Sequence, residues 1–300
     1  MRRKWEKLLN RLLTFAIVAV LLPLVVTIVM QRMELEEVIY GGKGAKADTS
    51  EEDLIGIVAK EIDIEAEREA ILAQCVVART NYYDAKKRGL TLPETLSEPE
   101  LKKLWGDSYE KNYRLLADCI QETSHQVLTW NGESIYAAYH ALSAGSTRNM
   151  QDVYPETKMP YLSAAPCVWD ITAEGYLGVY YLEKKEITDK CREAFPDAEL
   201  PEDGGEFPIA VESRDEAGYV LQVKVGGVVC TGEEFRACME LPSACFSVTE
   251  LDGKIRIVTK GIGHGLGLSI HSAGEMAKEG MKYQEILSYF YPNTELKEKV

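Results

Sequence analysis

An uncharged stretch, LLTFAIVAVLLPLVVTIVM, runs from Leu12 to Met30. As a helix it would span roughly 28 Å, about the thickness of a membrane's hydrocarbon core. Pro23 is compatible with such a helix because transmembrane segments tolerate proline. A cleaved signal peptide is the alternative, but its apolar region is usually only about 7–15 residues long. The pattern therefore predicts an uncleaved membrane anchor over residues 12–30.

After this run the hydrophobic pattern becomes that of a folded domain. Gly41, Gly42 and Gly44 indicate a stalk over 31–50. The Asn131-Gly132 pair between two β-prone runs predicts a hairpin. The other predicted elements are helices from Glu51 and over 65–87, 98–123, 172–205 and 233–239, strands at YVLQVKV, FSVTEL and KIRIVTK, and a Gly-rich loop, GIGHGLG, before a helix that ends near Tyr291.

These elements do not alternate as in βαβ units, so the sequence predicts an α+β fold. We expect a helical N-terminal part plus mixed β-rich regions that form a cleft, preceded by one transmembrane helix. The expected organisation is a tail over 1–11, the anchor over 12–30, the stalk over 31–50 and one domain over 51–300. A smaller β-rich subdomain is expected within it, over about 172–258.

Charge gives the expected orientation of the chain in the membrane. Residues 1–11 carry five basic residues and one acidic residue, a net charge of +4, so the total of −14 leaves −18 on the remainder. The positive-inside rule then places residues 1–11 in the cytoplasm and 31–300 outside the cell, on a single-pass protein of the cell membrane. An exported part this acidic excludes nucleic acid as a partner, because phosphates favour a basic surface.

The cysteines give no sign of a metal site. Their number is odd and none forms a C-x-x-C motif, so we expect mostly reduced, buried thiols. After His140 no further histidine or cysteine follows until Cys167, which does not support a local metal loop. No cofactor is expected. The seven cysteines are at positions 75, 119, 167, 191, 230, 238 and 245.

Glu61 is the first candidate for chemistry. Leu54, Val58 and Glu61 share one face of the helix predicted from Glu51. A carboxyl group held in an apolar cleft has a raised pKa and can stay protonated to act as a general acid. The alternative is that Glu61 is solvated at the end of the helix, and the pattern alone leaves this open.

His140 and His264 are the next candidates. His140 is predicted on a strand that runs into a small-residue turn, where a hydrogen-bonded core histidine is the common alternative to a catalytic one. His264 lies within GIGHGLG, and glycines allow the backbone to approach a ligand closely. The loop lacks the strand–turn–helix frame of a dinucleotide fold, and the chain has no G-x-S-x-G nucleophile elbow.

Several segments together resemble the family of stage II sporulation protein D, membrane-anchored lytic transglycosylases of endospore formers. The resemblance covers roughly residues 51–296. This chain departs from the family at Ile62-Asp63, where Met-Pro is usual, at Ile270–Ser272 within a usual Ser-Gln-Tyr-Gly, and at Ala144, which replaces a common glycine. The matching segments are LIGIVAKEIDIEAEREAILAQCVVARTNYY, YHALSAGSTRN, PYLSAAPCVWD, TGEEFRACMELPSACFSV and GIGHGLGLSIHSAGEMAKEGMKYQEILSYFYPNTEL.

The resemblance implies cleavage of peptidoglycan between N-acetylmuramic acid and N-acetylglucosamine, with 1,6-anhydro ends, during engulfment. Ordinary glycosidases use two carboxylates. A lytic transglycosylase can use one, because the C6 hydroxyl of the sugar itself attacks. Glu61 would then be the catalytic acid and base. The resemblance implies sugar-binding roles for Arg79, Thr80, His140, Ser143, Thr147 and His264.

The resemblance also implies partners: glycan strands stripped of stem peptides, and stage II sporulation proteins P and M. Two other functions stay open. One is a non-catalytic glycan-binding modulator of a wall amidase. The other is a water-using glycosidase, which needs a second carboxylate, and Asp152 and Asp170 are the nearest candidates.

Overall fold

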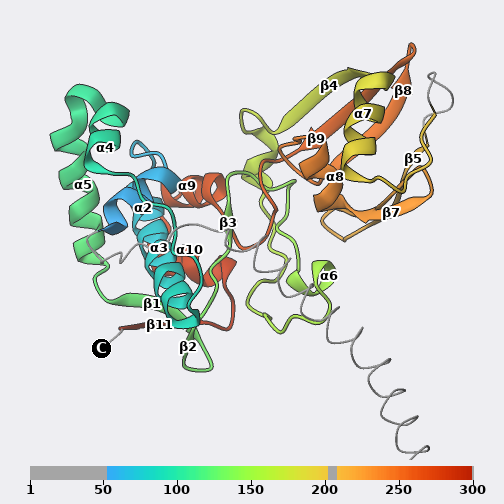
Figure 1. The fold of residues 1–300 in the computed structure, drawn as a ribbon. Helices are drawn as coiled ribbons and strands as arrows, with labels where there is room; N and C mark the ends of the chain where they lie inside the picture. Colours follow the sequence, from blue (N-terminus) through green and yellow to red (C-terminus); the bar gives the residue numbers. More distant parts are fainter. Residues whose placement is uncertain (1–52, 202–207, 299–300) are drawn as a thin grey trace, which may run out of the picture. The chain divides into compact units, whose positions relative to one another are not determined.

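The computed structural model describes residues 53–201 and 208–298 (Figure 1). The expected tail, anchor and stalk over residues 1–50 lie outside these ranges. No helix within them is long and apolar enough to cross a membrane. The described residues form helices and several antiparallel sheets, which confirms the α+β class. The chain divides into two compact units, and of the described residues only 85–93 belong to the first. All elements discussed below belong to the second unit, except the last turn of α3.

The helical part begins with α2 (Leu54–Glu61) and α3 (Arg68–Arg88). Residues 70–82 of α3 are all buried, as expected for a helix that neighbours cover on every side. The single helix expected over 98–123 is two helices, α4 (Glu98–Trp105) and α5 (Tyr109–Glu122). They are separated by a 3-10 turn that starts at Gly106, whose φ of 50° is readily adopted by glycine.

A small sheet and a short parallel pair follow the helices. In the sheet, β1 (Gln126–Trp130) lies between β2 (Glu133–Ser134) and β11 (Glu295–Glu298). The hairpin predicted at Asn131-Gly132 is confirmed, with positive φ at both residues, as a type I′ turn needs. In the pair, β3 (Tyr139–His140) lies parallel to β10 (Leu268–Ser269), which joins two segments far apart in the sequence.

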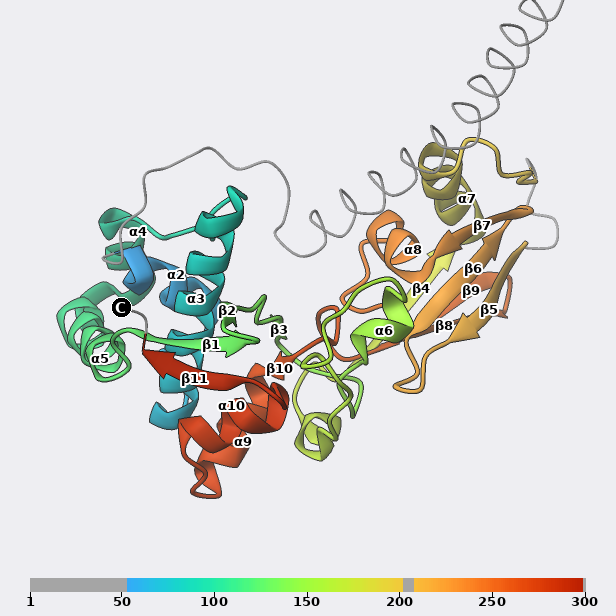
Figure 2. The same cartoon turned by 90° about the horizontal axis from the view of Figure 1, so that it is seen from below.

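Residues 177–260 form two three-stranded sheets with two helices (Figure 2). One sheet orders β4 (Leu177–Glu183), β9 (Lys254–Lys260) and β8 (Phe246–Leu251), and the other orders β5 (Ile209–Arg214), β6 (Val220–Val225) and β7 (Val228–Thr231). Helices α7 (Lys184–Ala194) and α8 (Gly232–Cys238) complete this part. Its core includes Ile187, Val223, Phe235 and Ile255.

The prediction of helix over the whole of 172–205 was wrong. Within this range, Leu177–Glu183 form β4, because LGVYYLE pairs with β9 along its full length, and the helix α7 begins only after it. The expected strands in YVLQVKV, FSVTEL and KIRIVTK are confirmed as β6, β8 and β9. The C-terminal helix is two helices, α9 (Ile270–Lys278) and α10 (Tyr283–Phe290), with Gly280 at a φ of 96° between them.

Two short helices lie in the segment between β3 and β4. They are α6 (Met150–Val153) and a 3-10 helix over Val168–Thr172. All seven cysteines are free thiols. Over residues 53–201 and 208–298, no group of three or more histidine, cysteine, aspartate or glutamate side chains is arranged to hold a metal ion.

Candidate active site

Glu61 is the last residue of α2 and lies in a groove of about 470 Å³. The helix ends there because Ile62 is extended, with φ −135° and ψ 145°. Glu61 is partly buried rather than fully solvated, so the end of the helix does not release it to water. The groove is lined by Ala59, Lys60, Glu61, Ile62, Asp63, Ile64, Glu65, Leu104, Trp105, Ser108 and Asn112.

Burial raises the pKa of Glu61 to about 7. Hydrogen bonds from Gln74 and Tyr139 and the charge of Lys60 act in the opposite direction and offset part of this rise. The C-terminal end of α2 carries the negative end of the helix dipole, which further disfavours the carboxylate. At neutral pH the group is therefore present in both protonation states, as a residue that first donates and then accepts a proton requires.

Gln74 is the first polar partner of Glu61. It projects from α3, is 1% exposed, and donates Nε2–H to Glu61 Oε2 over 2.8 Å. Its Oε1 is buried with no hydrogen-bond partner among the described residues. If the amide turned over, this oxygen would accept the proton of the acid form of Glu61. Gln74 thus offers a partner to each protonation state of Glu61.

Tyr139 supplies the second hydrogen bond to Glu61, through its hydroxyl group. Burial and the nearby Glu61 raise the pKa of Tyr139, so this hydroxyl stays a donor. Tyr139 belongs to β3, whereas Gln74 belongs to α3 and Glu61 to α2. Three elements that are separate in the sequence therefore converge on one carboxyl group.

His140 and His264 lie next to each other, with ring centroids 5.9 Å apart. His140 donates Nδ1–H to the Leu266 carbonyl over 3.1 Å, and His264 Nδ1 accepts from the Leu266 N–H over 3.0 Å. Burial lowers the pKa of His140 to about 4 and, together with nearby positive charge, that of His264 to about 3. Both rings are neutral at pH 7, and a hydrogen bond joins His264 to the backbone of Tyr139. The pair ties the loop GIGHGLG to β3.

The glycines of this loop allow it to lie directly against β3. A Cβ at Gly267, whose φ is 69°, would fall 1.9 Å from the Ala138 carbonyl oxygen, and one at Gly263 would fall 2.6 Å from His140 Cβ. No side chain larger than hydrogen fits either position. The close approach expected of these glycines is thus an approach to the protein's own strand.

Asp170 is a buried carboxylate whose two oxygens both accept hydrogen bonds within the protein. Its Oδ2 accepts from the Ser143 N–H and the Ser269 hydroxyl, both over 2.8 Å, and its Oδ1 accepts from the Ser272 hydroxyl over 2.7 Å. It is 0% exposed. These three bonds hold the Ser143 turn against the start of α9.

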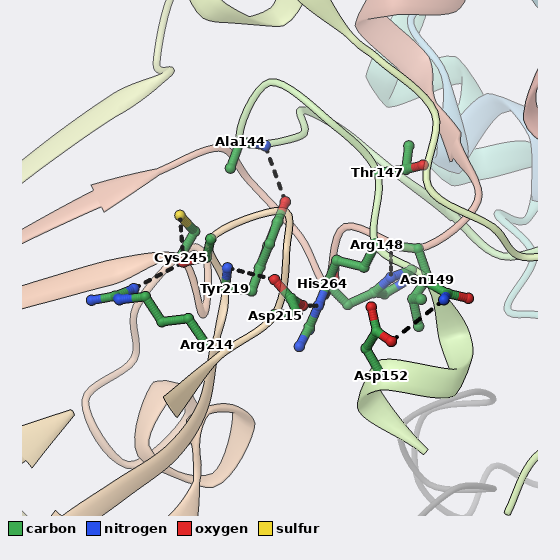
Figure 3. A network of polar contacts seen from close by, with 12 residues as sticks. Ala144, Thr147, Arg148, Asn149, Asp152, Arg214, Asp215, Tyr219, Cys245 and His264 are labelled. Carbon is green, nitrogen blue, oxygen red and sulfur yellow. Dashed lines mark hydrogen bonds and ion pairs between the residues drawn. The ribbon is translucent and has the colours of Figure 1, made fainter. Parts of the chain in front are cut away.

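Arg148 holds the other side of the GIGHGLG loop (Figure 3). It is 1% exposed and donates to Asp215 Oδ2 over 2.6 Å and to Glu233 Oε1 over 2.8 Å. It also donates to the His264 carbonyl over 3.2 Å, and its guanidinium lies 4.7 Å from the ring centroid of Tyr219. This network could not be predicted from the sequence, because the two acidic partners lie 67 and 85 residues away from Arg148.

The remaining residues expected to bind sugar are buried and bonded within the protein. Arg79 donates to the carbonyls of Thr123 and Ile120, over 2.7 and 2.9 Å, at the end of α5. Thr80 donates to the Val76 carbonyl, and Ser143 Oγ accepts from the Gly145 N–H.

Thr147 Oγ1 accepts from the Ala165 N–H over 2.8 Å. Among the described residues, the lining of the groove contains Glu61 and none of the other six expected site residues. Sugar binding by those six stays a prediction. Their contacts hold segments of the chain to one another.

The groove contains two carboxylates besides that of Glu61. Asp63 and Glu65 both line it, and Asp63 Oδ1 accepts from the Glu65 N–H over 3.0 Å. Asp152 and Asp170, the second carboxylates considered for a water-using enzyme, do not line it.

Known proteins match most of the chain. A family model described as stage II sporulation protein matches residues 46–130. Stage II sporulation protein D of Bacillus subtilis (strain 168) is 30% identical over 268 residues, covering 83% of this chain and 74% of that protein. Its namesake from Bacillus amyloliquefaciens is 28% identical over 262 residues, with the same coverage. The amidase enhancer of Bacillus subtilis (strain 168) is 25% identical over 291 residues, covering 81% of this chain and 40% of that protein.

Proposed function

Since the chain belongs to the family of stage II sporulation protein D, we propose that it is a peptidoglycan lytic transglycosylase that acts in sporulation. The proposed role in sporulation is taken from the names of two relatives, both called stage II sporulation protein D. The proposed substrate is the glycan strand, cut between N-acetylmuramic acid and N-acetylglucosamine. The observation that carries the proposal is Glu61, in an open groove with a pKa of about 7.

The proposed reaction needs one group that gives and then takes a proton. The acid form of Glu61 protonates the glycosidic oxygen as the bond from C1 of N-acetylmuramic acid breaks. The C6 hydroxyl of the same sugar then bonds to C1, and its proton passes to the Glu61 carboxylate. The product carries a 1,6-anhydro ring, no water is consumed, and Glu61 ends protonated as it began.

Gln74 and Tyr139 support both halves of this cycle. Their hydrogen bonds lower the pKa of Glu61 from the value that burial alone would give, which keeps the carboxylate accessible for the second half. Without them the buried carboxyl would hold its proton more strongly. Both groups sit on packed elements, so they also fix the direction of the carboxyl oxygens.

Localisation and partners belong to the same proposal. We propose that residues 12–30 anchor the chain in the cell membrane with the domain outside, and that stage II sporulation proteins P and M work beside it. An anchored enzyme would meet glycan strands freed of stem peptides at one membrane. Proteases added to the cytoplasmic side of inverted vesicles should then leave residues 51–300 intact.

A water-using glycosidase is the second candidate, favoured by Asp63 and Glu65 in the same groove. Such an enzyme needs one of them as base or nucleophile. Asp63→Asn keeps the oxygen that accepts from the Glu65 N–H, and Glu65→Gln keeps the side-chain size. The proposed transglycosylase retains most of its activity in both variants, whereas a hydrolase loses it in one.

A modulator of an amidase is the remaining possibility, and one relative is named an amidase enhancer. The test is cleavage of peptide-free glycan strands by the purified full chain, with Glu61→Gln as the matched variant. We expect the native chain to cleave and the variant to lose activity by orders of magnitude while keeping its circular dichroism spectrum. Equal cleavage by a folded Glu61→Gln protein would remove Glu61 from the reaction.

A further inference from the structure

Three aromatic residues form a row beside the groove. Trp105 is the last residue of α4, and Tyr109 and Tyr113 lie one turn apart in α5. The ring centroids of Trp105 and Tyr109 are 6.2 Å apart, and those of Tyr109 and Tyr113 are 5.7 Å apart. Of the three, only Trp105 lines the groove that contains Glu61.

Trp105 does not serve the core of this region. The buried apolar residue of α4 is Leu101, and α5 buries Leu116 and Cys119. Trp105 is partly exposed, and its neighbour in the lining, Leu104, is 55% exposed. A large apolar surface left open at the edge of a groove indicates a binding surface.

Trp105 is the ring of this row that faces the groove. Lys102 Nζ lies 5.3 Å from the ring centroid of Tyr109, so that ring already has a partner. Tyr109 in turn supports Trp105 at an interplanar angle of 37°. An aromatic ring braced in this way loses little conformational freedom when a ligand stacks on it.

We propose that Trp105, with Leu104 beside it, is a stacking subsite for one N-acetylhexosamine ring of the glycan strand. The pyranose ring has an apolar face of C–H groups that fits an indole. Ser108 and Asn112, on the same lining, offer a hydroxyl and an amide to the sugar's polar substituents. The subsite rests on the proposed function, since it would hold the strand while Glu61 acts on the bond.

The test separates binding from cleavage. The full chain carrying Glu61→Gln is titrated with a soluble N-acetylglucosamine oligomer and with peptide-free glycan strands, alone and combined with Trp105→Ala, Trp105→Phe or Tyr113→Ala. Tyr113→Ala is the matched control, because it removes an aromatic ring from the same row but not from the groove. We expect Trp105→Ala to weaken binding about tenfold, Trp105→Phe to weaken it less, and Tyr113→Ala to leave it nearly unchanged.

The same variants with Glu61 intact are compared by KM and kcat. A higher KM in Trp105→Ala with little change in kcat supports the subsite. Unchanged binding and KM in Trp105→Ala would overturn it while leaving the proposed cleavage intact.

Equal losses in Trp105→Ala and Tyr113→Ala would also overturn it, because the row would then be only structural. Trp105-dependent binding without cleavage by the native chain would keep the subsite and reject the proposed function. If Trp105→Ala fails to fold, Trp105→Phe decides the question. The subsite then requires that Trp105→Phe bind the glycan with a higher Kd and cleave it with a higher KM than the native chain.

Discussion

Gln74 donates its side-chain N–H to Glu61 over 2.8 Å from α3, in which residues 70–82 are all buried. The oxygen of the same amide has no partner among the described residues. A buried polar atom without a partner costs stability, and such costs are common where function requires them. Here the unpaired oxygen lies in the residue that contacts the proposed acid and base.

Replacing Gln74 by methionine should change the pH dependence of cleavage. The hydrogen bond from Gln74 lowers the pKa of Glu61, so its loss raises that pKa. The acid form that begins the reaction then persists to higher pH, so the alkaline limb of the kcat profile, where activity falls as Glu61 ionises, moves to higher pH. The measurement is kcat against pH for the native chain and Gln74→Met. An unmoved limb in a folded variant would mean that Gln74 does not act on Glu61.

Replacing Tyr139 by phenylalanine should move the same limb in the same direction. Tyr139 also lowers the pKa of Glu61 by a hydrogen bond. The pairing of β3 with β10 uses backbone groups, so the fold should persist. Because both residues act on one carboxyl group, the double variant should depart from the sum of the single effects in a double-mutant cycle. Strict additivity in the pH profiles would contradict a shared target.

Glu61 should make the protein less stable as the pH rises. The pKa of Glu61 is about 7 in the folded protein, against 4.5 for a solvent-exposed glutamate, so the folded state binds more protons than the unfolded state between these pH values. The free energy of unfolding therefore falls as pH rises from about 4.5 to about 7 through this group. Glu61→Gln lacks the effect and should be more stable than the native chain at pH 8, with a smaller difference near pH 5. Urea unfolding at both pH values measures it, and an equal difference at both would refute the raised pKa.

Arg148 should be essential for stability. Arg148→Met leaves Asp215 and Glu233 without their buried partner, and breaking such a buried pair costs about 3–5 kcal/mol. The control is Lys185→Ala, which removes an exposed pair with Asp189 and should cost less than about 1 kcal/mol. Urea unfolding of the two variants compares them directly. Similar small losses in both would show that the network around Arg148 contributes little.

The sequence predicted the local elements better than their partners. The Asn131-Gly132 turn and three strands follow from residue type and alternation, and they are confirmed. β4 was missed, because its strand conformation depends on pairing with the distant β9, in which Lys260 lies opposite Leu177. The break at Gly106 was also missed, since glycine is tolerated in many helices.

The site shows the same limit. Glu61 could be identified from its place on the apolar face of α2, whereas Gln74 and Tyr139 could not, because their role exists only where α3 and β3 meet α2. Periodicity also could not show that Arg79 bonds to Thr123 and that Thr80 accepts from the Leu128 N–H, since Thr123 and Leu128 lie beyond α3. Nor could periodicity show that Trp105, at the end of α4, lines the same groove as Glu61.

Cleavage in water enriched in ¹⁸O tests the central claim most directly. The native chain is incubated with peptide-free glycan strands in this water, and the new ends are analysed by mass spectrometry. A lytic transglycosylase closes a 1,6-anhydro ring with the sugar's own oxygen, so the account predicts new ends that lack one water and carry no ¹⁸O. Reducing ends that carry ¹⁸O would contradict it and would assign the second step to water activated by another carboxylate.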